Sequence, residues 1–149
     1  MSTLAPTQDW QRLANDSHYQ LAVAISEELR DGNVDEALAG LGELIEAMSE
    51  SRRRAMRSQL IRLMMHVLKW KSQPERRTGS WAGSIYESRD EIEAIQEEMP
   101  SLSDEYVRSV WAACFSKAKR RARAETQEKI ESTDLTWQEV FEDDFFVDL

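Results

Sequence analysis

Histidine and glutamate side chains are the residues of this sequence with the most evident chemical potential. His66 lies in the segment MMHVLKW, and Glu43 and Glu46 are three positions apart in an apolar-periodic stretch. Carboxylates at this spacing are neighbours on a helix surface, and helical bundles combine such pairs with histidine to bind metal ions. One hypothesis is therefore a metal- or histidine-assisted enzyme that uses His66 with Glu43 and Glu46.

The spacing of the apolar residues favours a simpler interpretation of the two glutamates. The stripe through Leu41, Leu44 and Met48 points away from Glu43 and Glu46, so a solvated face is expected for both. The sequence also contains no E-x-x-H pair and no H-E-x-x-H motif, which are the patterns of di-iron and zinc-hydrolase sites.

The remaining candidates for chemistry also have structural interpretations. His66 is expected at the edge of the apolar face of its helix, beside Trp70 and hydrogen-bonded to a neighbouring helix. The alternative for His66 is a ligand or general base paired with a carboxylate from another helix. Cys114 is in line with Val110 and Trp111, which predicts core packing rather than a nucleophile. The segment TGSWAGS lacks the strand and the lysine of a phosphate loop. The sequence therefore predicts no catalytic set and no cofactor.

Composition determines the kind of fold that must position these residues. The chain has 149 residues, of which 41% are hydrophobic, 32% are charged, five are glycine and three are proline. These values are typical of one globular domain built from helices. We predict an all-α fold, a compact bundle of five to six helices. Residues 1–14 are expected to form a loose N-terminal arm and residues 15–149 a single helical domain, with an acidic aromatic tail from about 131 to 149.

Apolar periodicity, caps and prolines divide the domain into elements. Helices are predicted over about 16–30, 34–48, 51–72, 80–99 and from 103 onward, and a capping box at Thr136–Glu139 predicts a short terminal helix. Gly40 and Gly42 are interpreted as sites of close approach to a neighbouring helix, and exposed positions are the alternative. The apolar stripe of the second predicted helix consists of Val34, Ala37, Leu38, Leu41, Leu44, Ile45 and Met48.

Charge is distributed in blocks. The net charge is −9, which argues against general affinity for nucleic acid. Residues 52–77 contain nine bases and one acid, whereas residues 131–149 contain seven acids and no base. We expect these faces to oppose each other within the bundle or across a homo-oligomer. Alternatively, Arg52–Arg54 and the segment KAKRRAR form a surface for nucleic acid or an acidic protein. The tail EDDFFVDL either docks its phenylalanines onto the bundle or is a linear motif held by a partner.

The compartment is predicted from what the sequence lacks. The single cysteine cannot form an intrachain disulfide, and the segment MSTLAPTQDW has no features of a secretory signal. No apolar run approaches the roughly 20 residues that span a bilayer. We therefore expect a cytoplasmic protein with no membrane partner.

Several segments together resemble a known family. The run LIRLMMHVLKWKSQPERRTGSWAGSI, the PSL at 100–102 and the late DDFF are similar to the bacterial "domain of unknown function 29", from Tyr19 to Phe146. The resemblance implies a small α-helical domain of the bacterial cytoplasm without an established activity. Leu44 departs from the family pattern, because a second consecutive glutamate is usual there. The characteristic positions would be Glu43, Glu46, His66, Lys69, Trp70, Pro74, Arg77, Trp81, Arg89 and Pro100.

Our leading functional hypothesis is a non-enzymatic helical interaction or regulatory module that binds a second copy of itself or another protein. An antitoxin-like regulator linked to nucleic acid is a further alternative, which the negative charge opposes. The candidate binding surface consists of His66, Lys69, Trp70, Arg77, Trp81 and Arg89.

Overall fold

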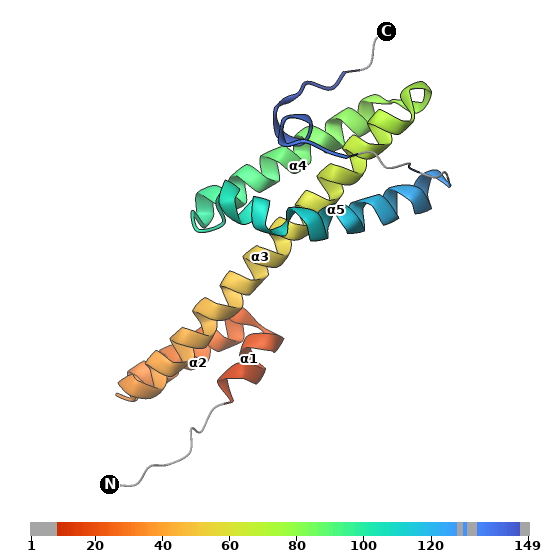
Figure 1. The fold of residues 1–149 in the computed structure, drawn as a ribbon. Coiled ribbons are helices and arrows are strands. Elements are labelled where there is room, and N and C mark those ends of the chain that lie inside the picture. Colours follow the sequence, from red (N-terminus) through yellow and green to blue (C-terminus); the bar gives the residue numbers. More distant parts are fainter. Residues whose placement is uncertain (1–8, 128–129, 131–133, 147–149) are drawn as a thin grey trace. The chain divides into compact units, whose positions relative to one another are not determined.

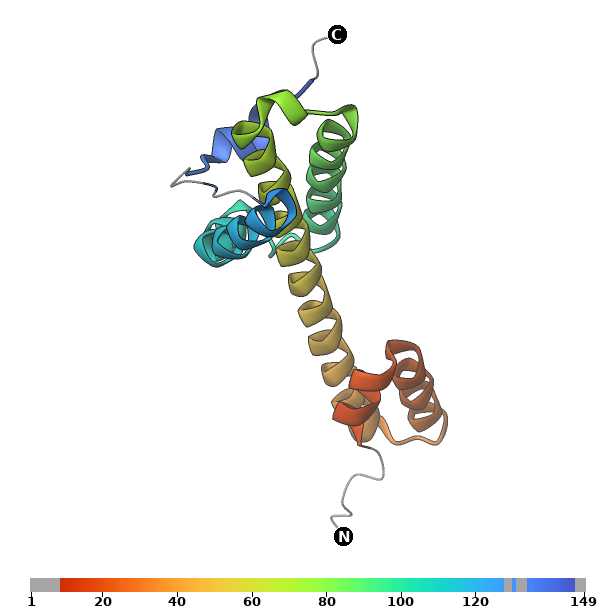
Figure 2. The same ribbon diagram turned by 90° about the vertical axis from the view of Figure 1, so that its right-hand side faces the viewer.

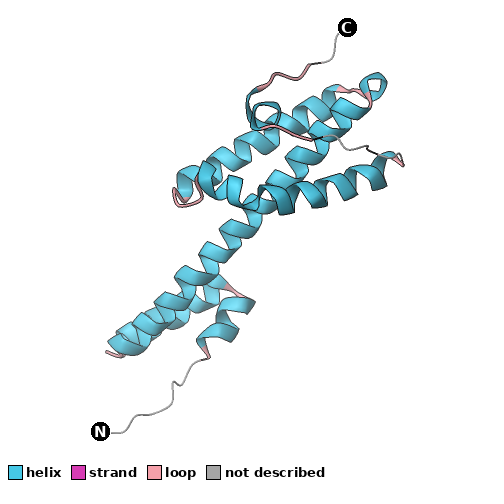
Figure 3. Ribbon diagram, viewed as in Figure 1, coloured by secondary structure: helices cyan, strands magenta, loops and turns pink. Residues whose placement is uncertain are grey.

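The computed structural model describes residues 9–127, 130 and 134–146, and every regular element in these ranges is helical (Figure 3). The all-α prediction is therefore confirmed. A 3-10 turn at Pro74–Arg76 joins two of the helices, and a π-helical turn spans Gln138–Glu142. The α-helices are α1 (Trp10–Asp16), α2 (His18–Arg30), α3 (Val34–Ser72), α4 (Gly79–Glu98) and α5 (Asp104–Thr126).

The chain divides into two compact units, residues 1–52 and residues 53–149, where the sequence predicted one domain after a loose arm. In unit 1, Trp10 begins α1, so part of the expected arm is a helix; residues 1–8 lie outside the described chain. The Trp10 side chain is buried and donates from Nε1 to Glu36 Oε1 at 2.8 Å. The core of unit 1 consists of Trp10, Leu21, Ala24, Ile25 and Ala37.

Helix α3 replaces the two helices that were predicted over 34–48 and 51–72. Ser49 lies at the junction between the two predicted helices and donates from Oγ to the Ile45 carbonyl oxygen at 2.8 Å. A serine can satisfy its hydroxyl in this way inside a helix. No glycine or proline occurs between Gly42 and Pro74, so nothing in the chain interrupts the helix.

Gly40 and Gly42 differ sharply in their surroundings. A Cβ atom at Gly40 would lie 2.8 Å from Ile25 Cγ1 and 2.9 Å from the Trp10 ring. The predicted close approach at Gly40 is therefore confirmed, and it is what lets α1 and α2 pack against α3 within unit 1. A Cβ at Gly42 would meet nothing within 4 Å, so the packing of this chain does not require a glycine there.

In unit 2, α4 and α5 flank the C-terminal part of α3, as the two perpendicular views show (Figure 1, Figure 2). Thr78 caps α4, which begins at Gly79, one position before the predicted start at 80; Ser103 caps α5, where Ser101 and Ser103 were both possible caps. The side chain of Cys114 is 2% exposed, and burial raises the pKa of its thiol, which agrees with a core role. The fully buried centre of α3 consists of Met56, Leu60, Leu63, Met64, Val67 and Leu68.

Candidate functional site

Unit 1 carries a stripe of exposed apolar side chains on the N-terminal part of α3. They belong to the apolar stripe predicted for this part of the chain, and they are 41–59% exposed. Their spacing alternates between four and three residues, which is the heptad pattern of a helix that packs against another helix. We call this set the α3 stripe; it consists of Val34, Leu38, Leu41, Ile45 and Met48.

A different face of α3 packs inside unit 1. Ala37 and Gly40 are buried and Leu44 is half-buried, and these residues contact the unit 1 core. At 100° per residue, the centre of this inner face is roughly 90° from the centre of the α3 stripe. Helices α1 and α2 therefore cover one side of α3 and leave the stripe open to solvent.

In unit 2, α3 and α5 border a groove with a volume of about 590 Å³. Ser58, Gln59 and Met65 contribute to its wall from α3, and Ala124 from α5. The charged and titratable side chains that line this α3–α5 groove are Arg62, His66, Lys69, Arg121 and Glu125. Two of the predicted surface residues, His66 and Lys69, therefore share one concave site.

His66 is half-buried, and its Nδ1 lies 2.9 Å from the carbonyl oxygen of Arg62, one turn earlier in α3. A carbonyl oxygen only accepts hydrogen bonds, so Nδ1 is the protonated nitrogen of the neutral ring. The partner belongs to the same helix, not to a neighbouring one as expected. Burial lowers the pKa of His66 below 6.5, and the positive charges of Lys69 and Arg62 act in the same direction. The ring is therefore mostly neutral at pH 7.

The carboxylates proposed as partners of His66 are not brought to it. Glu43 and Glu46 belong to unit 1, and His66 to unit 2. Glu46 is exposed, as expected, whereas Glu43 is half-buried and not fully solvated. Within the described ranges, no three His, Cys, Asp or Glu side chains are grouped as metal ligands would be. The geometry thus supplies no metal set built on Glu43, Glu46 and His66.

Charges within the α3–α5 groove are unevenly paired. Lys69 Nζ forms an ion pair with Glu125 Oε2 at 2.9 Å and lies 4.7 Å from the centre of the Trp81 ring. Arg62 lies 4.0 Å from Glu87, and both of these side chains are largely exposed. Arg121 forms no ion pair with any residue that the structure describes. Positive charge therefore exceeds negative charge along the groove.

Two of the other predicted surface residues, Trp70 and Arg89, contact the C-terminal segment, and Arg77 contacts Trp70. Trp70 is 6% exposed and meets Phe145 edge-on at 5.5 Å between ring centres. Arg77 donates from Nε to the Trp70 carbonyl oxygen at 2.8 Å. Arg89 donates from Nε to the Val140 carbonyl oxygen at 2.8 Å. These contacts give Trp70, Arg77 and Arg89 structural partners within unit 2.

The docking of the tail onto the bundle is confirmed for one of its two phenylalanines. Phe145 is 7% exposed, and its backbone N–H donates to the Tyr86 hydroxyl at 2.9 Å. Phe146 is 69% exposed, and Val147 and Leu149 lie outside the described residues. The preceding turn is held by the predicted capping box, in which Thr136 N–H donates to Glu139 Oε1 at 3.0 Å.

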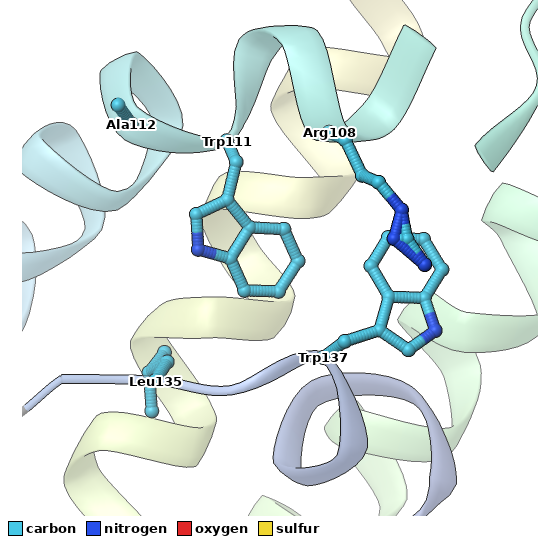
Figure 4. A pocket seen from close by; sticks show the side chains of 5 residues that line it. All are labelled: Arg108, Trp111, Ala112, Leu135 and Trp137. Carbon is cyan, nitrogen blue, oxygen red and sulfur yellow. The ribbon is translucent and has the colours of Figure 1, made fainter. Parts of the chain in front are cut away.

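A shallow aromatic pocket of about 380 Å³ was not found from the sequence (Figure 4). Trp111 and Trp137 stack at 5.7 Å between ring centres, and the Arg108 guanidinium lies 4.1 Å from the centre of the Trp137 ring. Arg108 and Trp111 are three residues apart on α5, a spacing that places them on one face. The sequence could have indicated that Arg108 and Trp111 share a face, but Trp137 joins them only through tertiary packing.

Comparison with known proteins gives one match. The family model described as "Domain of unknown function DUF29" matches residues 15–146, close to the span of the sequence resemblance. No curated protein and no solved structure matches the chain. No helix in the described ranges is long and apolar enough to cross a membrane. Because the matched region covers most of the sequence, the chain belongs to the family of the domain of unknown function DUF29.

Proposed function

We propose that this protein is a non-enzymatic, cytoplasmic interaction module whose partner is a second copy of itself, bound through the α3 stripe. The exposed heptad-spaced side chains of the stripe support this proposal most directly. Single exposed apolar residues are ordinary on protein surfaces, but a contiguous row is typical of an interaction site. Packing two such rows against each other removes both from water.

The charge pattern of α3 favours an antiparallel arrangement of the two copies. Asp35 and Glu36 are acidic at the start of the stripe, and Arg52–Arg54 are basic beyond its end. If Leu41 of one copy lies opposite Ile45 of the other, Val34 lies opposite Arg52. The acidic end of each copy then lies beside the basic end of the other, and two-fold symmetry makes this contact occur twice in the dimer. A parallel pair would place like charges together at both ends.

Substitution within the stripe tests the proposal. Leu41→Gln and Ile45→Gln each remove an apolar contact worth roughly 1.5–3 kcal/mol, so self-association is expected to weaken at least about tenfold. Ala39→Gln is the matched control, because Ala39 is exposed on the same turns of α3 but outside the stripe. Native mass spectrometry would report the dimer fraction. Equal dimer fractions in all three variants would contradict the proposal.

A charge swap tests the orientation. Asp35→Arg and Arg52→Asp, made singly, each place like charges near one another in the antiparallel pair. The double variant restores opposite charges across the interface, so its dimer fraction should recover toward that of the unmodified protein. A double variant that associates as weakly as the worse single variant would exclude this antiparallel register.

A further inference from the structure

The α3–α5 groove is a concave site formed by residues of unit 2, whereas the α3 stripe belongs to unit 1. Its volume of about 590 Å³ is within the range of pockets that take small molecules. The wall combines apolar atoms of Met65 and Ala124 with polar groups of Ser58 and Gln59. The chemistry of the occupant is set by the charges along this wall.

Among the residues that the structure describes, two positive side chains of the groove have no close buried counter-ion. Lys69 and Glu125 neutralise each other at 2.9 Å. Within the described ranges, the one ion pair of Arg62 is the long contact with Glu87, at 4.0 Å between side chains that are 43% and 64% exposed, and such a pair contributes little. Arg121 has no ion pair within the described chain. The net charge of the groove therefore matches a dianion.

We propose that the α3–α5 groove binds a small phosphomonoester, with Arg62 and Arg121 as the main contacts to its phosphate group. Guanidinium groups bind phosphate oxygens through paired, charge-assisted hydrogen bonds, which suits two arginines on facing helices. The rest of the groove accommodates the organic part of the ligand. His66 lines the same groove and keeps Nε2 as a potential hydrogen-bonding atom, because Nδ1 is used by the Arg62 carbonyl.

Binding is measured on the full chain through the His66 ring. The Hε1 resonance of His66 is followed by NMR during titration with inorganic phosphate, with chloride adjusted to hold the ionic strength constant; His18→Asn assigns the two histidines. Two charge-assisted contacts predict saturable binding with a Kd on the order of 1 mM or tighter. Bound dianion also stabilises the imidazolium, so phosphate should raise the pKa of His66.

Two neighbouring arginines of α5 provide a matched pair of variants. Arg121 lines the groove, whereas Arg120 is exposed and is not part of the lining. Arg121→Gln should weaken phosphate binding about tenfold or more, and Arg120→Gln, which removes the same charge, less than about twofold. Equal effects of the two variants, or a shift that grows linearly without saturation, would overturn the proposal.

The size of the ligand is tested by repeating the titration with adenosine 5′-monophosphate and with O-phosphoserine. If either phosphomonoester binds at least as tightly as inorganic phosphate, the groove accepts the organic part as proposed. Weaker binding of both than of inorganic phosphate would show that the site does not recognise a monoester. The variants and the reporter belong to unit 2, whereas the variants that test self-association belong to the α3 stripe of unit 1, so the two proposals are tested by separate measurements.

Discussion

The rings of Trp70 and Phe145 form a T-shaped pair, with 5.5 Å between the ring centres and 89° between the ring planes. This aromatic pair joins the last described segment of the chain to the end of α3. Arg77 and Arg89 support it, because their guanidinium carbons lie 4.9 Å from the Trp70 ring centre and 5.3 Å from the Phe145 ring centre. The C-terminal segment is therefore part of the unit 2 core.

Truncating Phe145 should destabilise unit 2. Phe145→Ala removes a side chain that is 7% exposed and opens a cavity against Trp70, so the free energy of unfolding should fall by about 3–5 kcal/mol. Phe146→Ala is the control, since Phe146 is 69% exposed and should cost less than about 0.5 kcal/mol. Urea denaturation followed by tryptophan fluorescence measures both values. Similar losses in the two variants would mean that the tail is not docked as described.

Arg89 should be important for stability through the backbone that it holds. It donates to the carbonyl oxygens of Val140 at 2.8 Å and Glu139 at 3.3 Å. Arg89→Met keeps much of the side-chain volume but removes these charged donors, so a loss of about 1.5–3 kcal/mol is expected by thermal or chemical denaturation. Arg120→Met, at an exposed position, should be close to neutral. If Arg89→Met is also neutral, these hydrogen bonds do not hold the π-helical turn.

Substituting the two glycines of α3 should have opposite effects. Gly40→Ala forces a Cβ to within 2.8 Å of Ile25 and 2.9 Å of Trp10, and such overpacking costs about 1–3 kcal/mol. Gly42→Ala places a Cβ in open space, so the better helix propensity of alanine should stabilise the protein by up to about 1 kcal/mol. Differential scanning calorimetry at low protein concentration would compare the unfolding temperatures of the two variants with that of the unmodified protein. A stabilising Gly40→Ala would contradict the packing described for unit 1.

The lowered pKa of His66 predicts how stability depends on pH. Burial disfavours the imidazolium in the folded protein, so the unfolded chain binds the proton more readily. The contribution of His66 to the free energy of unfolding is therefore fully present above pH 6.5. It is lost as the pH falls through 6.5 toward the lower pKa of the folded state. His66→Gln should flatten this part of the stability profile. A profile that stays equally steep in His66→Gln would assign the pH dependence to other groups.

Much of unit 2 could be predicted from the sequence because its signals are local. Ser103 caps α5, Pro100 follows the end of α4, and the Thr136–Glu139 capping box precedes the terminal turn. Each of these features depends on residues a few positions apart. The burial of Cys114 followed from the same periodicity, since residues three and four apart share one helix face.

The features that the sequence did not predict correctly depend on contacts between residues far apart in the chain. Periodicity correctly grouped Leu38, Leu41 and Ile45 on one face, but it cannot say whether a neighbouring helix covers that face. Within unit 1, the face that is buried contains Ala37 and Gly40, because Trp10 and α2 pack closely against it. The Trp111–Trp137 stack was missed for the same reason, since it joins α5 to the chain beyond it.

Sedimentation equilibrium of the unmodified chain measures self-association through the α3 stripe. The chain has a mass of 17.3 kDa. Across about a hundredfold range of concentration, mass action predicts a weight-average mass that rises from this value toward twice this value, and no further. In Ile45→Gln the rise should move to higher concentration. A mass that stays at 17.3 kDa throughout, or a rise that is identical in Ile45→Gln, would contradict the account.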